Sequence, residues 1–331
     1  MSDLAGTHVL VTGAGGFIGS HLVERLVADD AEVRAFCMYN SQGSWGWLDR
    51  APDEIRSSIE VRLGDVRDAA FVASATEGID IVLHLAALIA IPYSYVASDS
   101  FIETNVRGTL NVLEAARRAG VRRFVQTSTS EVYGTPQTLP IRETHPLNAQ
   151  SPYAASKVGA DQLSLAFGRS YGLPVAVLRP FNTYGPRQSV RAVLPAILIQ
   201  LLRGQRRVEL GRLEPRRDLT FVSDTVDGFV RAASAPAIVG EVVQLGTGRA
   251  VSIKELFDAA CSVLGIEAEV VQDPKRLRPD ASEVLVLQSD PAQAERLLGW
   301  TARVDLEDGL RRTAEWLRDH IGEYPHASHQ L

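Results

Sequence analysis

The chain has 331 residues, 45% hydrophobic and 22% charged, a composition typical of a globular protein long enough for two domains or lobes. Its net charge of −6 leaves no basic excess to neutralise phosphates, so nucleic acid is not an expected partner. Two cysteines, seven histidines without ligand spacing, no cationic leader and no membrane-length apolar run predict a cytoplasmic protein with no disulfide, metal site or membrane contact.

The N-terminal half alternates short β-rich runs with amphipathic helical patterns. Val106, Leu110 and Leu113 recur at helical spacing before Gly120, which is a typical helix end. Such alternation predicts an α/β fold, with a doubly wound parallel sheet covered by helices on both faces. We expect its strands at residues 8–12, 32–37, 59–63, 80–85, 121–127 and 175–179.

A glycine-rich run, Gly13-Ala-Gly-Gly16-Phe17-Ile18-Gly19, directly follows the first predicted strand and opens a helix. Glycines close a tight turn and let backbone amides approach a pyrophosphate, while the helix N-terminus adds free N–H groups. Because the run lies between a strand and a helix, it predicts a dinucleotide site. A glycine-rich turn without a ligand is the alternative.

The ends of the second and third strands carry weaker signals. An acidic residue after the second strand favours NAD and an arginine favours NADP, but this chain has Asn40 and Ser41 there. Both are candidate contacts to either cofactor, so the sequence expectation is NAD with NADP left open. Asp65 and Val66 follow the third strand as candidates for the adenine edge, with an ordinary turn aspartate as the alternative.

Candidate catalytic groups follow the fifth strand and open the next helix. Hydroxyls and one carboxylate, Glu131, gather in residues 127–134, at the sheet edge where ligands of α/β folds bind. Ser151 and a proline start a helix in which Tyr153 and Lys157 lie one turn apart on the same face. A lysine cation near a phenol is expected to lower the tyrosine pKa toward that of a general base. The alternative for residues 127–134 is a solvated polar loop, and the alternative for Tyr153 and Lys157 is an exposed pair without a catalytic role.

From about Phe181 the regular alternation of predicted strands and helices ends. An apolar helix is expected at residues 194–202, and Ser252 with Glu255 forms a capping box that opens another. Residues 241–246 have the pattern of a further strand that returns to the first sheet. We therefore expect a smaller α/β lobe interleaved with the first.

Several motifs taken together resemble the extended short-chain dehydrogenase/reductases, and within them the NAD-dependent epimerase/dehydratase group acting on nucleotide sugars. They run through nearly the whole chain and are residues 13–19, His84-Leu-Ala-Ala87, residues 104–109, residues 128–134, Tyr153 with Lys157, Arg179-Pro180-Phe-Asn182-Thr-Tyr-Gly-Pro-Arg187, residues 217–224 and Arg278-Pro279. The resemblance implies a Rossmann-type domain of residues 1–182, to which 218–250 return, and a nucleotide-sugar lobe of residues 183–217 and 251–331. It also implies a homodimer.

The resemblance assigns roles to single residues. Tyr153 would take the proton from the sugar 4-hydroxyl, Thr129 would hold the same oxygen, and Lys157 would also hold the nicotinamide ribose. Further cofactor contacts would be Gly13, Gly16, Phe17, Ile18, Gly19, Asn40, Ser41, Asp65, Val66, Ala86, Ala87 and Pro180. Substrate contacts would be Ser130, Asn182, Arg187, Val193, Arg217 and Arg278, since arginine forks match phosphate oxygens; a surface salt bridge is the alternative for each arginine.

Glu131 distinguishes the possible reactions. A 4-epimerase needs no such carboxylate, whereas in the resembling 4,6-dehydratases a glutamate here removes the C5 proton. UDP-glucuronate decarboxylases carry a similar run, and a non-catalytic NAD(P) sensor remains a further alternative. Ser130 stands where dTDP-glucose dehydratases have an aspartate, so the chain more closely resembles dehydratases of the GDP-mannose type and, most of all, those of the legionaminic acid pathway. The expected activity is that of a nucleotide-sugar 4,6-dehydratase.

Overall fold

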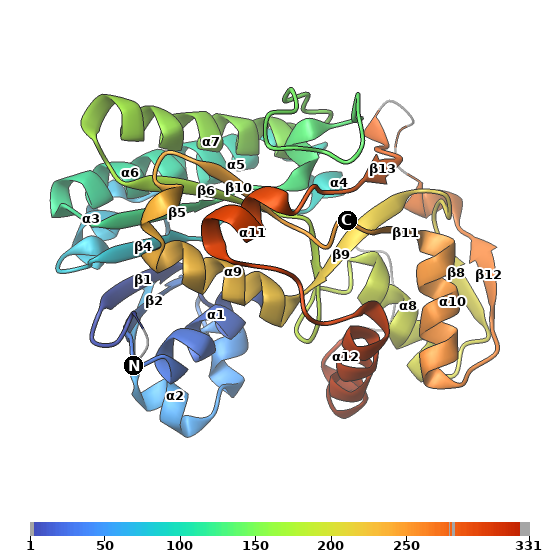
Figure 1. The fold of residues 1–331 in the computed structure, drawn as a ribbon. Helices are drawn as coiled ribbons and strands as arrows, with labels where there is room; N and C mark the ends of the chain where they lie inside the picture. Colours follow the sequence, from blue (N-terminus) through green and yellow to red (C-terminus); the bar gives the residue numbers. More distant parts are fainter. Residues whose placement is uncertain (1–2, 278, 280–281, 325–331) are drawn as a thin grey trace.

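The computed structural model describes residues 3–277, 279 and 282–324. Within these residues a seven-stranded sheet forms the centre (Figure 1), with the strands in the order β10-β6-β5-β4-β1-β2-β3 and every neighbouring pair parallel. The strands are β1 (His8–Thr12), β2 (Glu32–Met38), β3 (Ile59–Gly64), β4 (Ile81–His84), β5 (Arg123–Thr127), β6 (Val175–Pro180) and β10 (Val242–Leu245). The predicted parallel sheet is confirmed, and the strand expected at residues 241–246 does return to it.

Helices cover both faces of this sheet (Figure 1). One face packs on α1 (Phe17–Ala28) and α9 (Val222–Ser234), and the other on α3 (Ala69–Thr76), α6 (Gly108–Ala119) and α7 (Pro152–Tyr171). Neighbouring residues of β1 point to opposite faces, so Val9 and Val11 join the first apolar core and Leu10 joins the second. This two-sided burial explains why the strands are continuous apolar runs.

The smaller lobe is built mainly from the C-terminal half. A four-stranded sheet has the order β11-β9-β13 with β7 beside β9, and β12 pairs with β8 in a second sheet. Ser252 and Glu255 form the predicted capping box at the start of α10. The strands are β7 (Asn182–Tyr184), β8 (Arg207–Leu210), β9 (Arg216–Phe221), β11 (Ala250–Ser252), β12 (Glu269–Gln272) and β13 (Val286–Leu287), and the helices are α8 (Val193–Leu202), α10 (Ile253–Leu264), α11 (Ala292–Leu298) and α12 (Leu306–His320).

Short helical segments connect these elements. They are η1 (Gly46–Arg50), α2 (Asp53–Ser57), α4 (Ile91–Ser94), α5 (Ser98–Phe101), η2 (Ile102–Arg107), η3 (Ser130–Tyr133), η4 (Pro236–Ile238), η5 (Pro274–Arg276) and η7 (Ile321–Glu323). The helix predicted from Val106, Leu110 and Leu113 is present, but its first part is the π-helical segment η2, which leads into α6. Apolar spacing does not reveal such a local widening, which recurs at functional sites.

An aromatic cluster joins the two lobes. The ring of Trp47, in η1, lies 5.5 Å from that of Trp316 on α12 and 6.3 Å from that of Tyr324. Arg50 and Glu323 form an ion pair next to it. The end of the described chain is thereby fastened to the segment that follows β2. Among the described helices, none is both long and apolar enough to cross a lipid bilayer.

Candidate active site

The turn between β1 and α1 can be built only with glycines. Gly13 has a φ of 71°, and a Cβ there would lie 2.8 Å from the backbone nitrogen of Ala86. A Cβ on Gly19 would collide with the carbonyl of Gly13. Gly16 caps α1 without any side-chain hydrogen bond, and Phe17 and Ile18 form the first helical turn, so their N–H groups face the turn. The geometry suits the pyrophosphate of a dinucleotide.

Asn40, after β2, is occupied by its own loop. Its Oδ1 accepts hydrogen bonds from the backbone nitrogens of Gln42 (3.1 Å) and Ser44 (3.0 Å), while its Nδ2 donates to the carbonyls of Met38 and Ser44. The side chain therefore shapes the loop. Ser41, the next residue, is exposed.

The segment after β3 is fixed to α6. Asp65 accepts hydrogen bonds from the guanidinium and backbone nitrogen of Arg67, and these hydrogen bonds lower the pKa of Asp65. Val66 is buried and packs on Gly108, and its carbonyl accepts a hydrogen bond from Asn111. Asp65 thus has the bonding of the turn aspartate named as the alternative, and its contact to adenine stays a prediction.

The loop after β4 is held by residues that sequence reasoning did not single out. Thr12 Oγ1 accepts from the backbone nitrogens of Leu85 and Ala86 and is 2.7 Å from His84 Nδ1. The other ring nitrogen of His84 contacts Thr109 at 3.1 Å. Burial, reinforced by the charge of Lys157, lowers the pKa of His84 to about 3. His84 is therefore uncharged, and its contacts with Thr12 and Thr109 hold the backbone that leads to Ala86 and Ala87.

Asn105, in the π-helical segment, ties the same loop to α7. Its Oδ1 accepts from the Leu88 backbone nitrogen (2.8 Å), and its Nδ2 donates to the Leu88 carbonyl and to Ser156 Oγ (2.9 Å each). Ser156 lies beside Lys157. The motifs containing His84 and Asn105 carried the family resemblance, but spacing along the chain gives no sign of partners so far away in sequence.

Tyr153 and Lys157 are buried together near the start of α7, with exposures of 7% and 4%. Ser151 caps this helix by accepting from the Ala154 backbone nitrogen, as predicted. Burial raises the pKa of Tyr153 and the charge of Glu131 adds to the rise, while a hydrogen bond with Thr129 opposes it. This is opposite to the lowering expected from the sequence, because the cost of burying a phenolate outweighs the hydrogen bond with Thr129.

Burial acts on the lysine in the opposite sense. It lowers the pKa of Lys157 to about 8, against the charge of Asp161, which raises it. Lys157 therefore titrates close to neutral pH, unlike a solvated lysine.

Thr129 and Glu131 meet Tyr153 at the end of β5. Thr129 caps η3 by accepting from the Glu131 backbone nitrogen at 3.3 Å, and its side chain hydrogen-bonds with Tyr153. Ser130, the residue between Thr129 and Glu131, is buried, and Glu131 is half-buried. The structure thus brings together a hydroxyl, a carboxylate, a phenol and a cation. Such a set can hold an oxygen and move protons.

The predicted substrate residues are placed less uniformly. Asn182, at the start of β7, has a buried Oδ1 with no hydrogen-bond partner among the described residues, as expected of an atom that binds a ligand. Arg187 has a φ of 71° and donates to Ser20 Oγ (3.1 Å) and Glu24 (2.7 Å) on α1.

The other substrate candidates lie in the smaller lobe or at its border. Arg217 donates to Glu283 at 3.4 Å, with both side chains largely buried. Val193 opens α8. Pro180, a cofactor candidate, is the buried last residue of β6. Arg278 lies outside the described residues.

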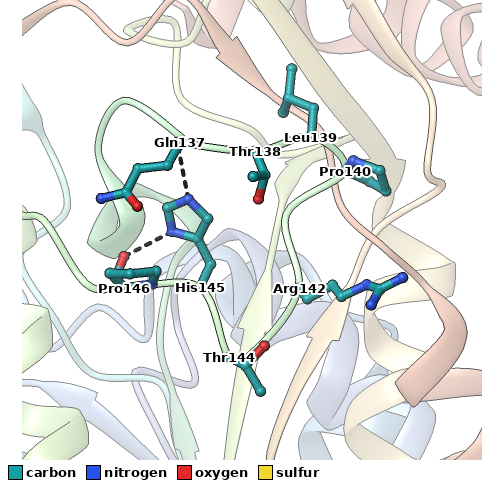
Figure 2. A pocket seen from close by; sticks show the side chains of 8 residues that line it. All are labelled: Gln137, Thr138, Leu139, Pro140, Arg142, Thr144, His145 and Pro146. Atoms are coloured by element: carbon teal, nitrogen blue, oxygen red, sulfur yellow. Dashed lines mark hydrogen bonds between the residues drawn. The ribbon is translucent and has the colours of Figure 1, made fainter.

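A separate hollow of about 410 Å³ lies in the loop between η3 and α7 (Figure 2). His145 shapes it, since its Nε2 accepts from the Gln137 backbone nitrogen (2.9 Å) and its Nδ1 lies 2.8 Å from the Pro146 carbonyl. None of the predicted site residues lines this hollow.

Comparisons with known proteins identify the family of the chain. The sequence pattern of the family described as GDP-mannose 4,6 dehydratase matches residues 10–313. A UDP-glucose 4-epimerase from Mycolicibacterium smegmatis is 36% identical over 315 residues, covering 94% of this chain and 98% of the relative. A dTDP-glucose 4,6-dehydratase from Streptomyces griseus is 36% identical over 325 residues, covering 95% of each.

The crystal structure of DesIV, a dTDP-glucose 4,6-dehydratase from Streptomyces venezuelae with NAD bound, matches with a TM-score of 0.86. It is 33% identical and covers 96% of this chain and 99% of its own. These likenesses confirm the Rossmann-type fold and the resemblance to nucleotide-sugar enzymes, and they agree with the NAD expected from the sequence. The chain therefore belongs to the GDP-mannose 4,6 dehydratase family and is an NAD-dependent enzyme of the sugar-nucleotide dehydratase and epimerase type.

Proposed function

We propose that this protein is a nucleotide-sugar 4,6-dehydratase in which Thr129, Glu131, Tyr153 and Lys157 carry the chemistry. The observation that favours this reaction is Glu131, a half-buried acid whose charge acts on Tyr153. Simple 4-epimerisation has no use for such an acid. NAD, when bound, accepts the hydride from C4 of the sugar and returns it to C6.

Tyr153 removes the proton of the sugar 4-hydroxyl while Thr129 holds the same oxygen. In the free protein burial keeps the Tyr153 proton in place, because it raises the pKa of the phenol. Positive charge brought to a buried phenol lowers its pKa, so we expect cofactor binding, together with Lys157, to convert Tyr153 into a base.

Glu131 then removes the C5 proton, which the new C4 ketone has made acidic. Ser130 supplies no acid, so Glu131 returns the same proton to the C6 hydroxyl, which leaves as water. The C5 proton and the C6 hydroxyl together account for the lost water. Return of the hydride to C6 requires one proton at C5, and the proton that Tyr153 took from the 4-hydroxyl balances it. The product is a 4-keto-6-deoxy sugar.

The NAD contacts proposed are the glycine turn with Phe17 and Ile18, the loop residues Asn40, Ser41, Asp65, Val66, Ala86, Ala87 and Pro180, and the pair Tyr153 and Lys157. Support comes from the fit of the glycine turn and from the carboxyl-end position of these loops. The NAD-binding domain comprises residues 1–182 with 218–250, and the sugar-nucleotide lobe comprises residues 183–217 and 251–331.

The diphosphate and sugar contacts proposed are Ser130, Asn182, Arg187, Val193, Arg217 and Arg278. The orphaned Oδ1 of Asn182 supports its part. Arg187 and Arg217 each hold a carboxylate in the described structure, so binding a diphosphate requires each guanidinium to exchange or share that partner.

Mass spectrometry of the product tests the proposed reaction directly. The parent protein with NAD is offered a panel of UDP-, GDP-, dTDP- and CDP-sugars, and loss of water marks the substrate. Glu131→Gln should slow this loss by about 10²–10⁴-fold, the usual contribution of a positioned acid–base group. Glu295→Gln, an exposed site on α11, is the control. Formation of product by Glu131→Gln at the parental rate would overturn the assignment.

A 4-epimerase or a UDP-glucuronate decarboxylase of the same fold is the second candidate. It is favoured by the 36% identity to the M. smegmatis UDP-glucose 4-epimerase, which equals that to the S. griseus dehydratase. Loss of carbon dioxide would identify the decarboxylase. A product of unchanged mass that separates from the substrate on chromatography would identify the 4-epimerase. Tight NAD binding without turnover across the panel would instead indicate a cofactor sensor.

A homodimer built on α6 and α7 is also proposed. These helices lie side by side on one face of the sheet (Figure 1), and Ile102 and Tyr171 near their ends are exposed by 47% and 59%. Sedimentation measurements should give twice the monomer mass. Cytoplasmic residence is proposed as well, since both described cysteines are free thiols.

A further inference from the structure

Asp161 lies one turn beyond Lys157 on α7 and is completely buried. Its Oδ2 accepts hydrogen bonds from Ser128 Oγ at 2.6 Å and from two nitrogens of Arg179 at 3.0 and 3.3 Å. Its Oδ1 has no hydrogen-bond partner among the described residues. Ser128 directly precedes Thr129, so this carboxylate connects the catalytic helix to the end of β5.

Arg179 extends the same network to the neighbouring strands. From β6, beside Pro180, it donates to the Tyr133 hydroxyl at 2.9 Å and lies over the Tyr133 ring. That hydroxyl is 2.6 Å from the side-chain amide of Gln244 on β10. The network therefore spans β5, β6 and β10, underneath the proposed site.

A buried ion pair of this kind is an expensive way to hold a fold together. The Asp161 and Arg179 side chains are 0% and 3% exposed. Desolvation of two such charges offsets much of their attraction, and apolar residues of similar volume often stabilise a protein as well or better. Stability alone is therefore a weak explanation for this pair, and its position beside Lys157 offers another.

The charge of Asp161 reaches Lys157. Burial lowers the pKa of this lysine to about 8, and Asp161 raises it. The other titratable groups near Lys157 supply no balancing anion: His84 on β4 is neutral, and Tyr153 on α7 keeps its proton. The charges of Glu131 on η3 and of Asp161 both raise the pKa of Tyr153, and Arg179 carries positive charge. Among the described residues, Asp161 is the anion that favours the charged form of Lys157.

We propose that Asp161 is a positioning residue that keeps Lys157 protonated and, through Ser128, holds Thr129 against the catalytic helix. The benefit to catalysis rests on the proposed roles of Lys157 and Thr129. The charge state of Lys157, in contrast, is measurable without any substrate, so the two ideas fail separately.

The sequence makes a direct measurement practical, because the chain has three lysines: Lys157, Lys254 and Lys275. Lysine labelled with ¹³C at Cε gives three NMR signals, whose shifts over a pH series report each pKa. Lys157→Met assigns the buried signal. Asp161→Asn should lower the pKa of Lys157 by on the order of one unit or more, since a buried charge is poorly screened.

The protein contains its own matched control. Lys254 and Asp258 have the same four-residue spacing on α10, with a 2.6 Å contact, but their side chains are 54% and 55% exposed. Asp258→Asn should lower the pKa of Lys254 by at most a few tenths of a unit, because solvent screens exposed pairs.

Asp161→Asn leaves Arg179 buried beside a neutral partner and risks unfolding. The double variant Asp161→Asn/Arg179→Gln removes both charges and is expected to keep the fold, which circular dichroism checks. Its Lys157 pKa should still lie below that of the parent. A Lys157 pKa equal to the parent's in the folded double variant overturns the proposal, even where the single variant unfolds.

Ser128→Ala separates the second part of the proposal. It removes the hydrogen bond to Asp161 but no charge, so the Lys157 pKa should stay parental while kcat falls about tenfold at unchanged KM. Ser164→Ala is the control. Ser164 is buried on α7 and its hydroxyl donates to the Ala160 carbonyl, so this variant should leave kcat unchanged. Equal kcat values for the two serine variants would overturn the positioning of Thr129. Absence of turnover in the parent would bear on the proposed function and leave the NMR result standing.

Discussion

Lys157→Met is expected to stabilise the protein while abolishing turnover. Folding lowers the pKa of this lysine from 10.5 to about 8. A drop of roughly 2.5 units at 1.36 kcal/mol per unit corresponds to about 3 kcal/mol of unfavourable charge burial. Methionine keeps the length of the side chain without the charge. This shift already includes the opposing attraction to Asp161, so the expected gain is about 3 kcal/mol.

The sign of the pH dependence follows from the direction of the shift. Because the folded pKa lies below the unfolded value, the unfolded chain binds more protons between about pH 8 and 10.5. The penalty in the parent is therefore complete below about pH 8 and disappears as the pH rises through 10.5. The gain of Lys157→Met should follow the same course.

Urea unfolding of the parent and of Lys157→Met, followed by circular dichroism at pH 7, 9 and 10, measures the difference. Lys254→Met, an exposed lysine, is the control and should change the free energy of unfolding by less than about 0.5 kcal/mol. A Lys157→Met protein less stable than the parent at pH 7 would refute the reasoning. So would a gain that stays constant from pH 7 to 10.

Gly13→Ala should weaken NAD binding at least tenfold by calorimetry, because its φ is 71° and the new methyl group would lie 2.8 Å from the Ala86 nitrogen. Gly265→Ala is the control, because Gly265 has a similar φ of 65° but nothing lies within 4 Å of the added methyl group. It should cost about 1 kcal/mol of stability and leave NAD binding intact. Equal NAD affinity of the two variants would contradict the role of the glycine turn in binding NAD. Trp316→Ala should lower the free energy of unfolding by about 3 kcal/mol, since it empties the aromatic cluster with Trp47; a loss under 1 kcal/mol would show that the cluster contributes little.

The sheet and its order of elements could be predicted because they depend on local patterns. Continuous apolar runs separated by amphipathic helices indicate a parallel sheet, and Ser151 with its proline marked the start of α7 correctly. The capping box at Ser252 was visible for the same reason. Each of these signals lies within a few residues of the structure it specifies.

The supporting residues of the site could not be predicted, because their partners are far away in the sequence. Thr12 and His84 are separated by 72 residues, and Ser128 and Asp161 by 33. The direction of the Tyr153 pKa shift was also wrong from sequence, since it depends on burial by surrounding chain rather than on the neighbouring lysine. Proximity along a helix predicts a pair but not its environment.

The return of β10 to the edge of the sheet has a consequence for synthesis. β6 pairs with β10 along Val177–Pro180, and β10 ends only at Leu245, after the first part of the other lobe has been made. On the ribosome, the outer edge of β6 stays unpaired for more than sixty residues of elongation, and unpaired edges promote aggregation. The chain thus leaves the first lobe, begins the second and returns to the first, so neither lobe can be completed before the other has been started. A truncation before residue 245 should leave the nascent protein dependent on chaperones instead of yielding a separable half.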